Sequence, residues 1–437
     1  MKEIVAELKK NVEQVELYHY QTVQNEVVFQ DGKLNGLEGA IQSGYSIRIV
    51  KDNMLGFAYT KTLTNPALLL ESALNSLKAG TKTNLRFPAN LESKNLNNYD
   101  PRIEDTTTKQ VVDECQRVVE ILKSSLDAKI DIRVNYGTEK IVIINSQGTE
   151  LSENFSGYVF ALALVFPNTA GGLHYLFWSK SFAPVPESEL NNLITMYQKG
   201  LNETKIESGK MKVLFLPTTL YALLWRLQSG TAGNNIYYKK SPLVNKVGEK
   251  IFSEKLTIYD DPLNEEYPTA RSFDDEGVPT KKLMIVEKGV LRNFYYDLFY
   301  ADKMGVESTG NGYKGAMWGG EFAALKPAPT LAHLFIEPGR KSWEELIGLM
   351  DRGIIVGGVL GAHSGNIPNG DFSIGIEPCF YVEKGEIIGR VKNAMIAGNI
   401  YNVMKNVVEI ENTLHPSFIA GKALPAILFD EIMVVSG

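Results

Sequence analysis

Three adjacent acidic residues, Asp274, Asp275 and Glu276, form the stretch of the sequence with the most potential for chemistry. Such carboxylates can supply a general base or oxygen ligands for a hard metal ion. Neighbouring residues of an extended chain point to opposite faces, so three in a row rarely converge on one centre. The competing interpretation is a tight turn with Gly277 at positive φ, in which the carboxylates accept backbone N–H bonds and ion pairs.

Histidines and nucleophiles offer fewer candidates. The five histidines are all more than six residues apart, so the sequence has no H-E-x-x-H helix and no His/Cys cluster with metal-ligand spacing. His363 lies in a Gly-rich stretch, where its side chain could reach a ligand. There is no G-x-S-x-G elbow and no Walker loop, and Gly310-Asn311-Gly312 lacks the Lys-Ser/Thr that would complete a phosphate site.

The elements that must position these residues belong to the second half of the chain. Residues 212–216 read as a buried strand, and an apolar helix follows at Leu220–Leu227. A second helix is predicted from Ser342, because Ser342 and Glu345 have the spacing of a capping box. Repeated glycines between these elements indicate short or curved strands. We therefore predict a Gly-rich, mainly-β C-terminal domain with a few helices at 212–437.

The first half of the chain divides into smaller units. Residues 1–85 combine helices with strands and read as an N-terminal two-layer α/β domain, and the polar, Asn-rich stretch 86–107 reads as an exposed linker. Residues 108–211 read as a central α+β domain. Its helix followed by strands echoes the first unit, which leaves a distant internal duplication open. Helices and strands do not alternate regularly along the chain, so the fold class is α+β.

Composition limits the possible partners. The 437 residues include 45 basic and 51 acidic side chains, and the net charge of −6 without a basic cluster argues against direct nucleic-acid binding. Cys115 and Cys379 are the only cysteines, which is typical of a reducing compartment. The sequence has no N-terminal secretion signal and no apolar run of about 18 residues. We expect a cytoplasmic protein that does not enter the membrane.

The order of several motifs resembles a known family. A strand and apolar helix at 213–230 come first, followed by the stretch Thr269–Val278, then Ser308–Gly312, then Ile396–Asn399. Together they resemble the TldD/PmbA family, whose members have been labelled modulators of DNA gyrase. The resemblance implies one of two kinds of chain. TldD-type members resemble zinc metallopeptidases with an H-E-x-x-x-H helix and a C-terminal cysteine ligand, whereas PmbA-type (TldE) members lack these ligands and pair with a TldD-type chain.

The resemblance identifies this chain with the PmbA/TldE type. Trp225 and Gly230 stand where the ligand histidines would be, and Arg226 stands where the general-base glutamate would be. Residues 417–422 contain no cysteine. Trp offers only an N–H donor, Gly offers no side chain and Arg cannot act as a base at neutral pH. The resemblance thus implies no metal or other cofactor in this chain, with zinc expected only in a TldD-type partner.

The leading hypothesis is therefore a non-catalytic subunit that pairs with a TldD-type catalytic subunit or with itself, and whose assembly processes unfolded or modified peptides. A peptide would bind by adding to a sheet edge, with Arg226, Asn311, His363 and Asn399 as candidate lining residues. One alternative is a stand-alone hydrolase that uses the carboxylates of residues 274–276. Another alternative is a binding protein that modulates DNA gyrase.

Overall fold

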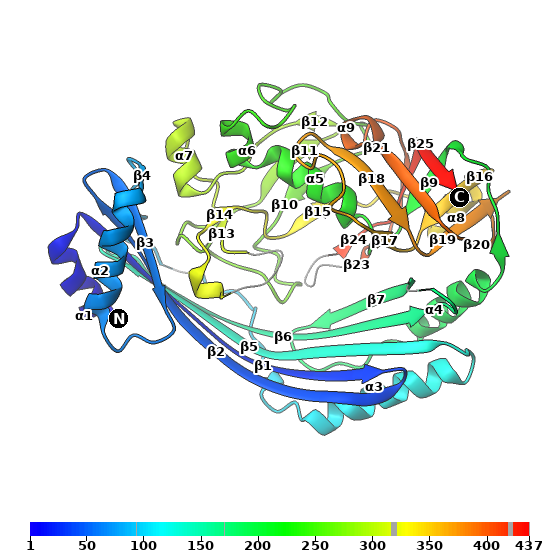
Figure 1. Ribbon diagram of the computed structural model, residues 1–437, viewed down its shortest axis with the longest axis horizontal. Helices are drawn as coiled ribbons and strands as arrows, with labels where there is room; N and C mark the ends of the chain where they lie inside the picture. The colour runs from blue at the N-terminus through cyan, green and yellow to red at the C-terminus, as the bar shows by residue number, and fades with distance from the viewer. Residues whose placement is uncertain (93, 170, 316–320, 418–422, 437) are drawn as a thin grey trace.

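The structure is a computed structural model that describes residues 1–92, 94–169, 171–315, 321–417 and 423–436. Its first half is built on a seven-stranded antiparallel sheet in the order β4-β3-β2-β1-β5-β6-β7. Four of the strands are 16 to 19 residues long, and Figure 1 shows them as a long curved cradle. The strands are β1 (Gln14–Gln30), β2 (Lys33–Lys51), β3 (Met54–Thr60), β4 (Thr81–Lys82), β5 (Lys129–Asn145), β6 (Glu150–Val165) and β7 (Gly172–Ser179).

Helices cover the convex face and one end of this sheet. Helix α3 (Thr108–Lys123) begins at a capping box formed by Thr107 and Gln110, and it buries an apolar stripe that includes Cys115 and Leu122. Figure 1 shows α3 on the outer side of the curve and α1 (Lys2–Leu8) and α2 (Pro66–Ser76) at one end. Helix α4 (Glu187–Gly200) follows β7. Short 3₁₀ helices span Lys9–Asn11, Leu77–Ala79, Pro101–Ile103 and Phe322–Ala324.

The predicted units at 1–85 and 108–211 share this one sheet. Strands β1 and β5 pair continuously, from Glu16 opposite Asn145 to Phe29 opposite Ile132. Each unit alone would have an exposed edge of unpaired N–H and C=O groups, and the β1–β5 pairing satisfies both edges. Each unit also reads helix, three strands, helix, which is the echo noted in the sequence. The central pairing makes the two units one layer.

The segment 86–107, predicted to be an exposed linker, is exposed over most of its described residues but is anchored to the protein at a few points. Phe87 and Ile103 are buried, and the backbone N–H of Phe87 donates to Gln14 on β1. Asn98 is also buried, and its Nδ2 donates to the carbonyl oxygen of Ala270 at 3.0 Å. The polar composition suggested solvent, but several of these polar groups form hydrogen bonds to the protein instead. The segment therefore ties the sheet to the second half of the chain.

The second half contains a ten-stranded mixed sheet and a smaller four-stranded sheet, with helix α5 packed between them in one core. The large sheet contains β8 (Glu203–Thr204), β9 (Gly209–Phe215), β16 (Arg352–Val356), β17 (Val359–Leu360), β18 (Asp371–Ile376), β19 (Cys379–Glu383), β20 (Glu386–Val391), β21 (Ala394–Asn399), β22 (Val407–Ile410) and β25 (Ile427–Ser436). The small sheet contains β10 (Ile258–Asp260), β11 (Leu283–Glu287), β12 (Val290–Leu291) and β15 (Leu334–Ile336).

Short elements complete this half. Two-stranded ladders pair β13 (Gly312–Tyr313) with β14 (Ala328–Pro329) and β23 (His415–Pro416) with β24 (Ala423–Leu424). The helices are α5 (Tyr221–Thr231), α6 (Gly233–Tyr237), α7 (Leu298–Met304), α8 (Trp343–Gly348) and α9 (Ile400–Val403). The predicted capping box of Ser342 and Glu345 is confirmed at the start of α8. The mainly-β character expected for this half is also confirmed, and the fold as a whole is α+β.

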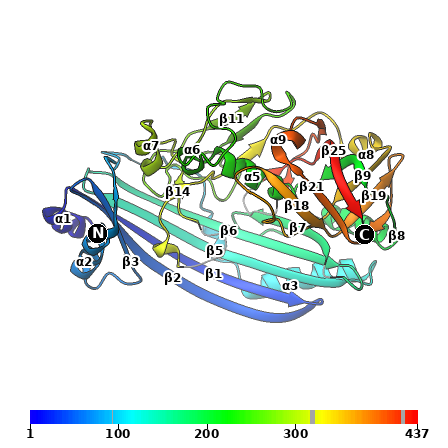
Figure 2. The ribbon, with the colours of Figure 1, turned by 45° about the horizontal axis from the view of Figure 1, so that its top comes forward.

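The C-terminal half lies against the concave face of the long sheet. Figures 1 and 2 both show it seated inside the curve, on the side opposite α3. Contacts between side chains far apart in sequence join the two halves, such as the hydrogen bond from the hydroxyl of Tyr18 on β1 to Asp275. Within the part of the chain that the structure describes, no helix has the length and apolar character needed to cross a membrane.

Candidate functional site

Helix α5 carries all three positions singled out above, Trp225, Arg226 and Gly230. Trp225 is half-buried, whereas the charged Arg226 is 0% exposed. The guanidinium of Arg226 donates from Nε to the carbonyl oxygen of Asp371 (2.7 Å), from Nη2 to that of Ser364 (2.6 Å) and from Nη1 to that of Ala222 (2.5 Å). Burial lowers the pKa of Arg226. Arg226 thus fastens α5 to the loop before β18.

The third substituted position, Gly230, has no room for a side chain. A Cβ atom there would overlap the hydroxyl oxygen of Tyr401 and would lie 3.3 Å from its Cζ. The hydroxyl of Ser241 donates to the carbonyl oxygen of Gly230 at 2.6 Å, which fixes the backbone at this point. Tyr401 therefore occupies the space into which a longer residue at position 230 would project.

Asn399 and His363 lie near the loop that Arg226 holds. Asn399 caps α9 by accepting the backbone N–H of Tyr401 at 3.0 Å, and its Nδ2 donates to Oδ1 of Asp371 at 2.8 Å. This hydrogen bond contributes to lowering the pKa of Asp371. His363 lies next to Ser364 in the same loop and is exposed. The structure thus brings Arg226, Asn399 and His363 to one loop, although Arg226 and Asn399 are occupied by hydrogen bonds that hold the loop.

The carboxylate of Asp274 accepts hydrogen bonds from backbone N–H groups, two of them in its own turn. Its Oδ1 accepts the N–H groups of Glu276 (3.0 Å) and Val278 (2.9 Å), and its Oδ2 accepts the N–H of Gly312 (2.8 Å). Gly277 has φ +73°, as the turn interpretation predicts. Burial and the neighbouring Glu276 raise the pKa of Asp274 well above its usual value, while the backbone hydrogen bonds oppose the rise.

Asp275 points away from Asp274, toward the long sheet. Its Oδ1 accepts hydrogen bonds from the hydroxyl of Tyr18 (2.9 Å) and from Nη2 of Arg271 (2.8 Å). Its Oδ2 accepts the backbone N–H of Lys314 at 2.7 Å. With three donors on a carboxylate that is 1% exposed, Asp275 joins the two halves of the chain and anchors Arg271.

Glu276 belongs to a third, separate set of contacts. Its Oε1 accepts a hydrogen bond from Nη1 of Arg48 on β2, and its Oε2 accepts the backbone N–H of Leu298 at 2.5 Å. Arg48 also pairs with Glu16 on β1, through Nε at 2.8 Å and Nη2 at 2.9 Å. Burial and the negative charge of Glu276 raise the pKa of the nearby Asp297 to about 8. The three carboxylates of residues 274–276 therefore do not converge on one centre.

Asn311 is part of a buried polar network. Its Nδ2 donates to Oδ2 of Asp260 at 2.8 Å, and its Oδ1 accepts the hydroxyl of Thr309 at 2.7 Å. Asp260 also accepts the backbone N–H of His333 at 2.6 Å. Because both ends of the Asn311 amide have partners, the residue positions the strands around it.

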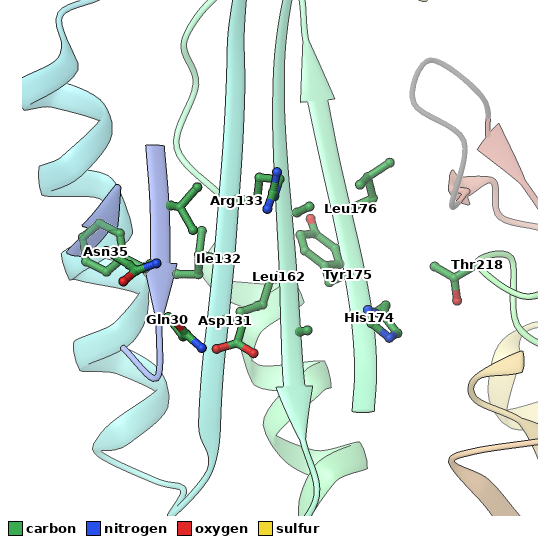
Figure 3. Close-up of a pocket in the computed structure, with 14 residues that line it drawn as sticks. Gln30, Asn35, Asp131, Ile132, Arg133, Leu162, His174, Tyr175, Leu176 and Thr218 are labelled. Carbon is green, nitrogen blue, oxygen red and sulfur yellow. The ribbon is translucent and has the colours of Figure 1, made fainter. Parts of the chain in front are cut away.

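Two cavities lie along the long sheet. Figure 3 shows the first, of about 450 Å³, where His174 on β7 lies on the side facing Thr218 of the loop after β9. Burial lowers the pKa of His174. Asp131 and Arg133 on β5 also line this cavity. The β6 residues opposite Arg133 and Asp131 are Ala161 and Ala163, and their small side chains leave the floor of the cavity open.

The second cavity, of about 360 Å³, begins one step further along the same strands. Asn135 and Val159, which are opposite each other on β5 and β6, belong to its floor. Its residues from the sheet are Gln24, Asn135–Glu139, Phe155–Gly157 and Val159. Its residues from the C-terminal half are Pro268, Thr269, Arg271, Asp275, Tyr313, Lys314, Phe322, Ala332 and His333. This cavity is therefore enclosed by both halves of the chain.

Comparison with known proteins decides the family. Residues 208–436 match the PmbA/TldA metallopeptidase C-terminal domain, and residues 15–79 match PmbA/TldA metallopeptidase domain 1. The chain belongs to the PmbA/TldD family. A metalloprotease TldD homolog from Haemophilus influenzae is 24% identical over 466 residues, covering 97% of this chain and 93% of that protein.

Solved structures share the fold over the full length. TldE from Thermococcus kodakarensis aligns with a TM-score of 0.89 at 23% identity and covers 100% of both chains. The Thermotoga maritima protein TM0727, named as a candidate modulator of a DNA gyrase, aligns with a TM-score of 0.86 at 25% identity and covers 99% of both chains. The sheet cradle and the C-terminal half seated inside it are thus the PmbA/TldD fold.

The family's metallopeptidase chemistry does not fit the residues on α5. A catalytic zinc needs about three protein ligands and an open position for water. Here Trp225 has no lone pair to offer, Arg226 is bonded to carbonyl oxygens, and Tyr401 fills the space beside Gly230. Within the described ranges, no three His, Cys, Asp or Glu side chains are grouped so that they could hold a metal ion. Positions 418–422, part of the C-terminal stretch considered above, lie outside the described residues.

The second cavity contains residues that sequence reasoning did not select. Arg271, Tyr313 and Lys314 converge there with Glu139, which lies 132 positions before Arg271. The only signal in the sequence was the spacing of Arg271 and Asp275, which form an i,i+4 ion pair at 2.8 Å. Arg271 therefore lies in the stretch Thr269–Val278 that carried the family resemblance. Glu139 on β5, however, could not be identified without knowledge of the sheet pairing.

Proposed function

We propose that this chain is a zinc-free, non-catalytic PmbA/TldE-type subunit of a cytoplasmic assembly that processes unfolded or modified peptides. Its partner is a TldD-type catalytic subunit, which supplies the zinc. Pairing with a second copy of itself is the form expected where no TldD-type chain is present.

One observation carries the proposal. The helix position that would hold the general base is occupied by Arg226, whose guanidinium donates to three backbone carbonyl oxygens. Arg cannot accept a proton at neutral pH, and its three hydrogen bonds have structural partners. The overlap that a side chain at Gly230 would make with Tyr401 supports the same interpretation. A single lost ligand could be replaced from elsewhere, but here the base position and the ligand space both have structural occupants.

Metal content is the first test. The purified chain is incubated with zinc, desalted and analysed for metal by elemental analysis. We expect well below one zinc per chain. Tight stoichiometric zinc would contradict the zinc-free assignment and would direct attention to His363, the carboxylates of residues 274–276 and Cys379 as ligands.

Reconstitution is the second test. Hydrolysis of an unfolded, fluorescently labelled polypeptide is measured for this chain alone, for a TldD-type chain from the same organism alone, and for their mixture. We expect hydrolysis by the mixture and background rates for this chain alone. Activity of this chain after metal removal would refute the subunit function and favour a stand-alone hydrolase. Amide replacements at Asp274, Asp275 and Glu276 would then identify the group responsible.

A role in modulating DNA gyrase is tested separately. The net charge of −6 and the lack of a basic cluster make direct DNA contact unfavourable. DNA binding measured at two salt concentrations reveals any affinity driven by phosphates, because such affinity falls steeply with salt. Salt-dependent binding in the micromolar range would favour the gyrase or nucleic-acid role over the peptide role.

A further inference from the structure

The second cavity has a floor made of backbone. Gly157 of β6 lies opposite Gly137 of β5, and both line the cavity. A Cβ atom at Gly137 would overlap the carbonyl oxygen of Val23, so this position cannot carry a side chain. A Cβ atom at Gly157 would meet nothing within 4 Å, so this position faces open space. The two glycines therefore leave this part of the cavity floor without side chains.

The walls contain polar groups that the described residues leave unpaired. Nε of Arg271 and the hydroxyl of Tyr313 are buried and have no hydrogen-bond partner in the part of the chain that the structure describes. Tyr313 is 6% exposed and lines the cavity. The side-chain carboxylate of Glu139, which comes from β5, forms no hydrogen bond with any residue that the structure describes. Buried polar groups are nearly always paired, so the two donors require an acceptor. Almost none of their surface is exposed, so a ligand reaches them only when the wall of the cavity shifts slightly.

These groups define one ligand chemistry. Nε of Arg271 and the hydroxyl of Tyr313 are donors that lack an acceptor among the described residues, and the carboxylate of Glu139 is an acceptor that lacks a donor there. A ligand that complements these groups has a carboxylate, which accepts from the two donors, and a nearby N–H group, which donates to Glu139. We propose that this cavity binds an N-acylated α-amino acid carboxylate, the chemistry of the carboxyl terminus of a peptide.

In this arrangement the carboxylate lies against Arg271 and Tyr313, and the amide N–H donates to Glu139. The oxygens of Asp275 do not compete for the N–H, because Tyr18, Arg271 and the backbone of Lys314 already donate to them. Among the described residues, Arg271 uses only Nη2 of its five N–H donors for a side-chain hydrogen bond. Its guanidinium can therefore hold Asp275 and a ligand carboxylate together.

The size and walls of the cavity suit an apolar terminal side chain. A volume of about 360 Å³ is at the lower end of the range for small-molecule sites, enough for one or two residues of a peptide. Phe155, Phe322 and Val159 supply apolar surface, and the guanidinium of Arg271 lies over the ring of Tyr313 at 5.2 Å. A folded chain would not enter, whereas a free chain end would.

The charges that face Glu139 give the site a pH signature. Burial raises the pKa of Glu139 to about 7, Arg271 lowers it and Asp275 raises it. Further titratable groups around the cavity are Lys314, Tyr18, Tyr20, Tyr136, Tyr313 and His333. A ligand carboxylate beside Arg271 adds negative charge near Glu139, so binding favours the protonated form of Glu139, whose carbonyl oxygen still accepts the amide N–H. Affinity should therefore fall as the pH rises through about 7.

The choice of a peptide as the natural source rests on the function proposed above, whereas the binding test uses this chain alone. The probe is a fluorescein-labelled pentapeptide that ends in phenylalanine with a free carboxylate, and its binding is measured by fluorescence anisotropy. The same peptide with a carboxamide end is the matched control. We expect the amide to bind at least ~10-fold more weakly, since a hydrogen bond to a charged group is lost.

N-acetylphenylalanine, used as a competitor, distinguishes the two sources of this chemistry. If the peptide binds more tightly than N-acetylphenylalanine, the site recognises a chain end. Equal affinity assigns the site to a small acylated amino acid. Both outcomes support the proposal, and equal binding of the free and amidated peptides would overturn it.

Four variants test the geometry. Gly157→Leu places a side chain in the open space at this position and should abolish binding, whereas Ala161→Leu, on the same face of β6 in the first cavity, should not change it. Tyr313→Phe removes only the unpaired hydroxyl and should weaken binding roughly 3- to 10-fold. Glu139→Gln should retain binding and lose its dependence on pH.

Each variant is first checked by thermal melting. Unchanged affinity in Gly157→Leu, in a protein that melts like the wild type, would refute the site. The proposed function is tested by zinc content and reconstitution, whereas the cavity is tested by peptide binding. Either proposal can therefore be refuted without refuting the other.

Discussion

The contact between Gly230 and Tyr401 gives a sharp prediction about packing on α5. Gly→Ala within a helix normally stabilises a protein by roughly 0.5–1 kcal/mol. At position 230 the added methyl group would overlap the hydroxyl oxygen of Tyr401, and overpacking of this kind costs about 1–3 kcal/mol. We therefore expect Gly230→Ala to destabilise the protein by about 1–2 kcal/mol, the opposite sign to the ordinary helix effect.

The same contact predicts the outcome in a second background. Tyr401→Phe removes the overlapping oxygen and leaves the ring carbon Cζ at 3.3 Å from the new methyl group. The hydroxyl's hydrogen bond to Pro368 is long, at 3.4 Å, so its loss should be small. In this background Gly230→Ala should be neutral or stabilising by up to ~1 kcal/mol. The double-mutant cycle should therefore show a favourable coupling of about 1–3 kcal/mol.

Thermal melting of the four proteins measures this cycle. A change of 1 kcal/mol shifts Tm by about 2–4 °C in a domain of 150–250 residues, the size of the segment that carries α5. Gly348→Ala at the end of α8 is the control, because a Cβ atom there meets nothing within 4 Å. If Gly230→Ala is as harmless as Gly348→Ala, or if its penalty persists in the Tyr401→Phe background, the Tyr401 hydroxyl does not fill this space.

Three further predictions concern the buried charges. Asp275→Asn leaves Arg271 without its carboxylate, so unfolding by urea should show a loss of about 3–5 kcal/mol. The pKa of Asp297 is raised to about 8, so its proton is retained on folding and stability is lost as pH rises from about 4 to about 8. Asp297→Asn should therefore match the wild type at pH 4 and exceed it by at least ~1 kcal/mol at pH 8.5, and a parallel pH dependence would refute this. Arg48→Met leaves Glu276 buried without its cation, and the loss, about 3–5 kcal/mol near neutral pH, should shrink at pH 5, where carboxylates can protonate. Equal losses at both pH values would mean that the pair contributes little electrostatically.

Local features of this fold were readable from the sequence. The helix predicted at Leu220–Leu227 is present as α5, and the capping box at Ser342 starts α8 as predicted. The turn interpretation of the acidic stretch is also confirmed, since Gly277 has positive φ and Asp274 accepts backbone N–H groups. Each of these features depends on residues within about four positions of one another, so side-chain type and spacing were sufficient.

Features that depend on contacts between residues far apart in the sequence could not be predicted from the sequence. Strand β1 runs without a break over 17 residues because β2 and β5 pair with it on both sides. Tyr18 reaches Asp275 across 257 positions, and no local pattern indicates such a contact. The cavity between Glu139 and Arg271 depends on the same sheet pairing. Its site residues could be identified only after the curvature of the sheet brought the C-terminal half against them.

The substitutions on α5 are best explained as the acquisition of structural roles. A buried guanidinium is costly unless its donors are satisfied, and Arg226 satisfies them with carbonyl oxygens of its own helix and of residues 364 and 371. A glutamate at this position would place a carboxylate against the same carbonyl oxygens, where like partial charges repel. A histidine at position 230 would need Tyr401 to move, and Asn399 caps the helix that carries Tyr401. Placing a glutamate and a histidine at these two positions of α5 would therefore require rebuilding the loop before β18.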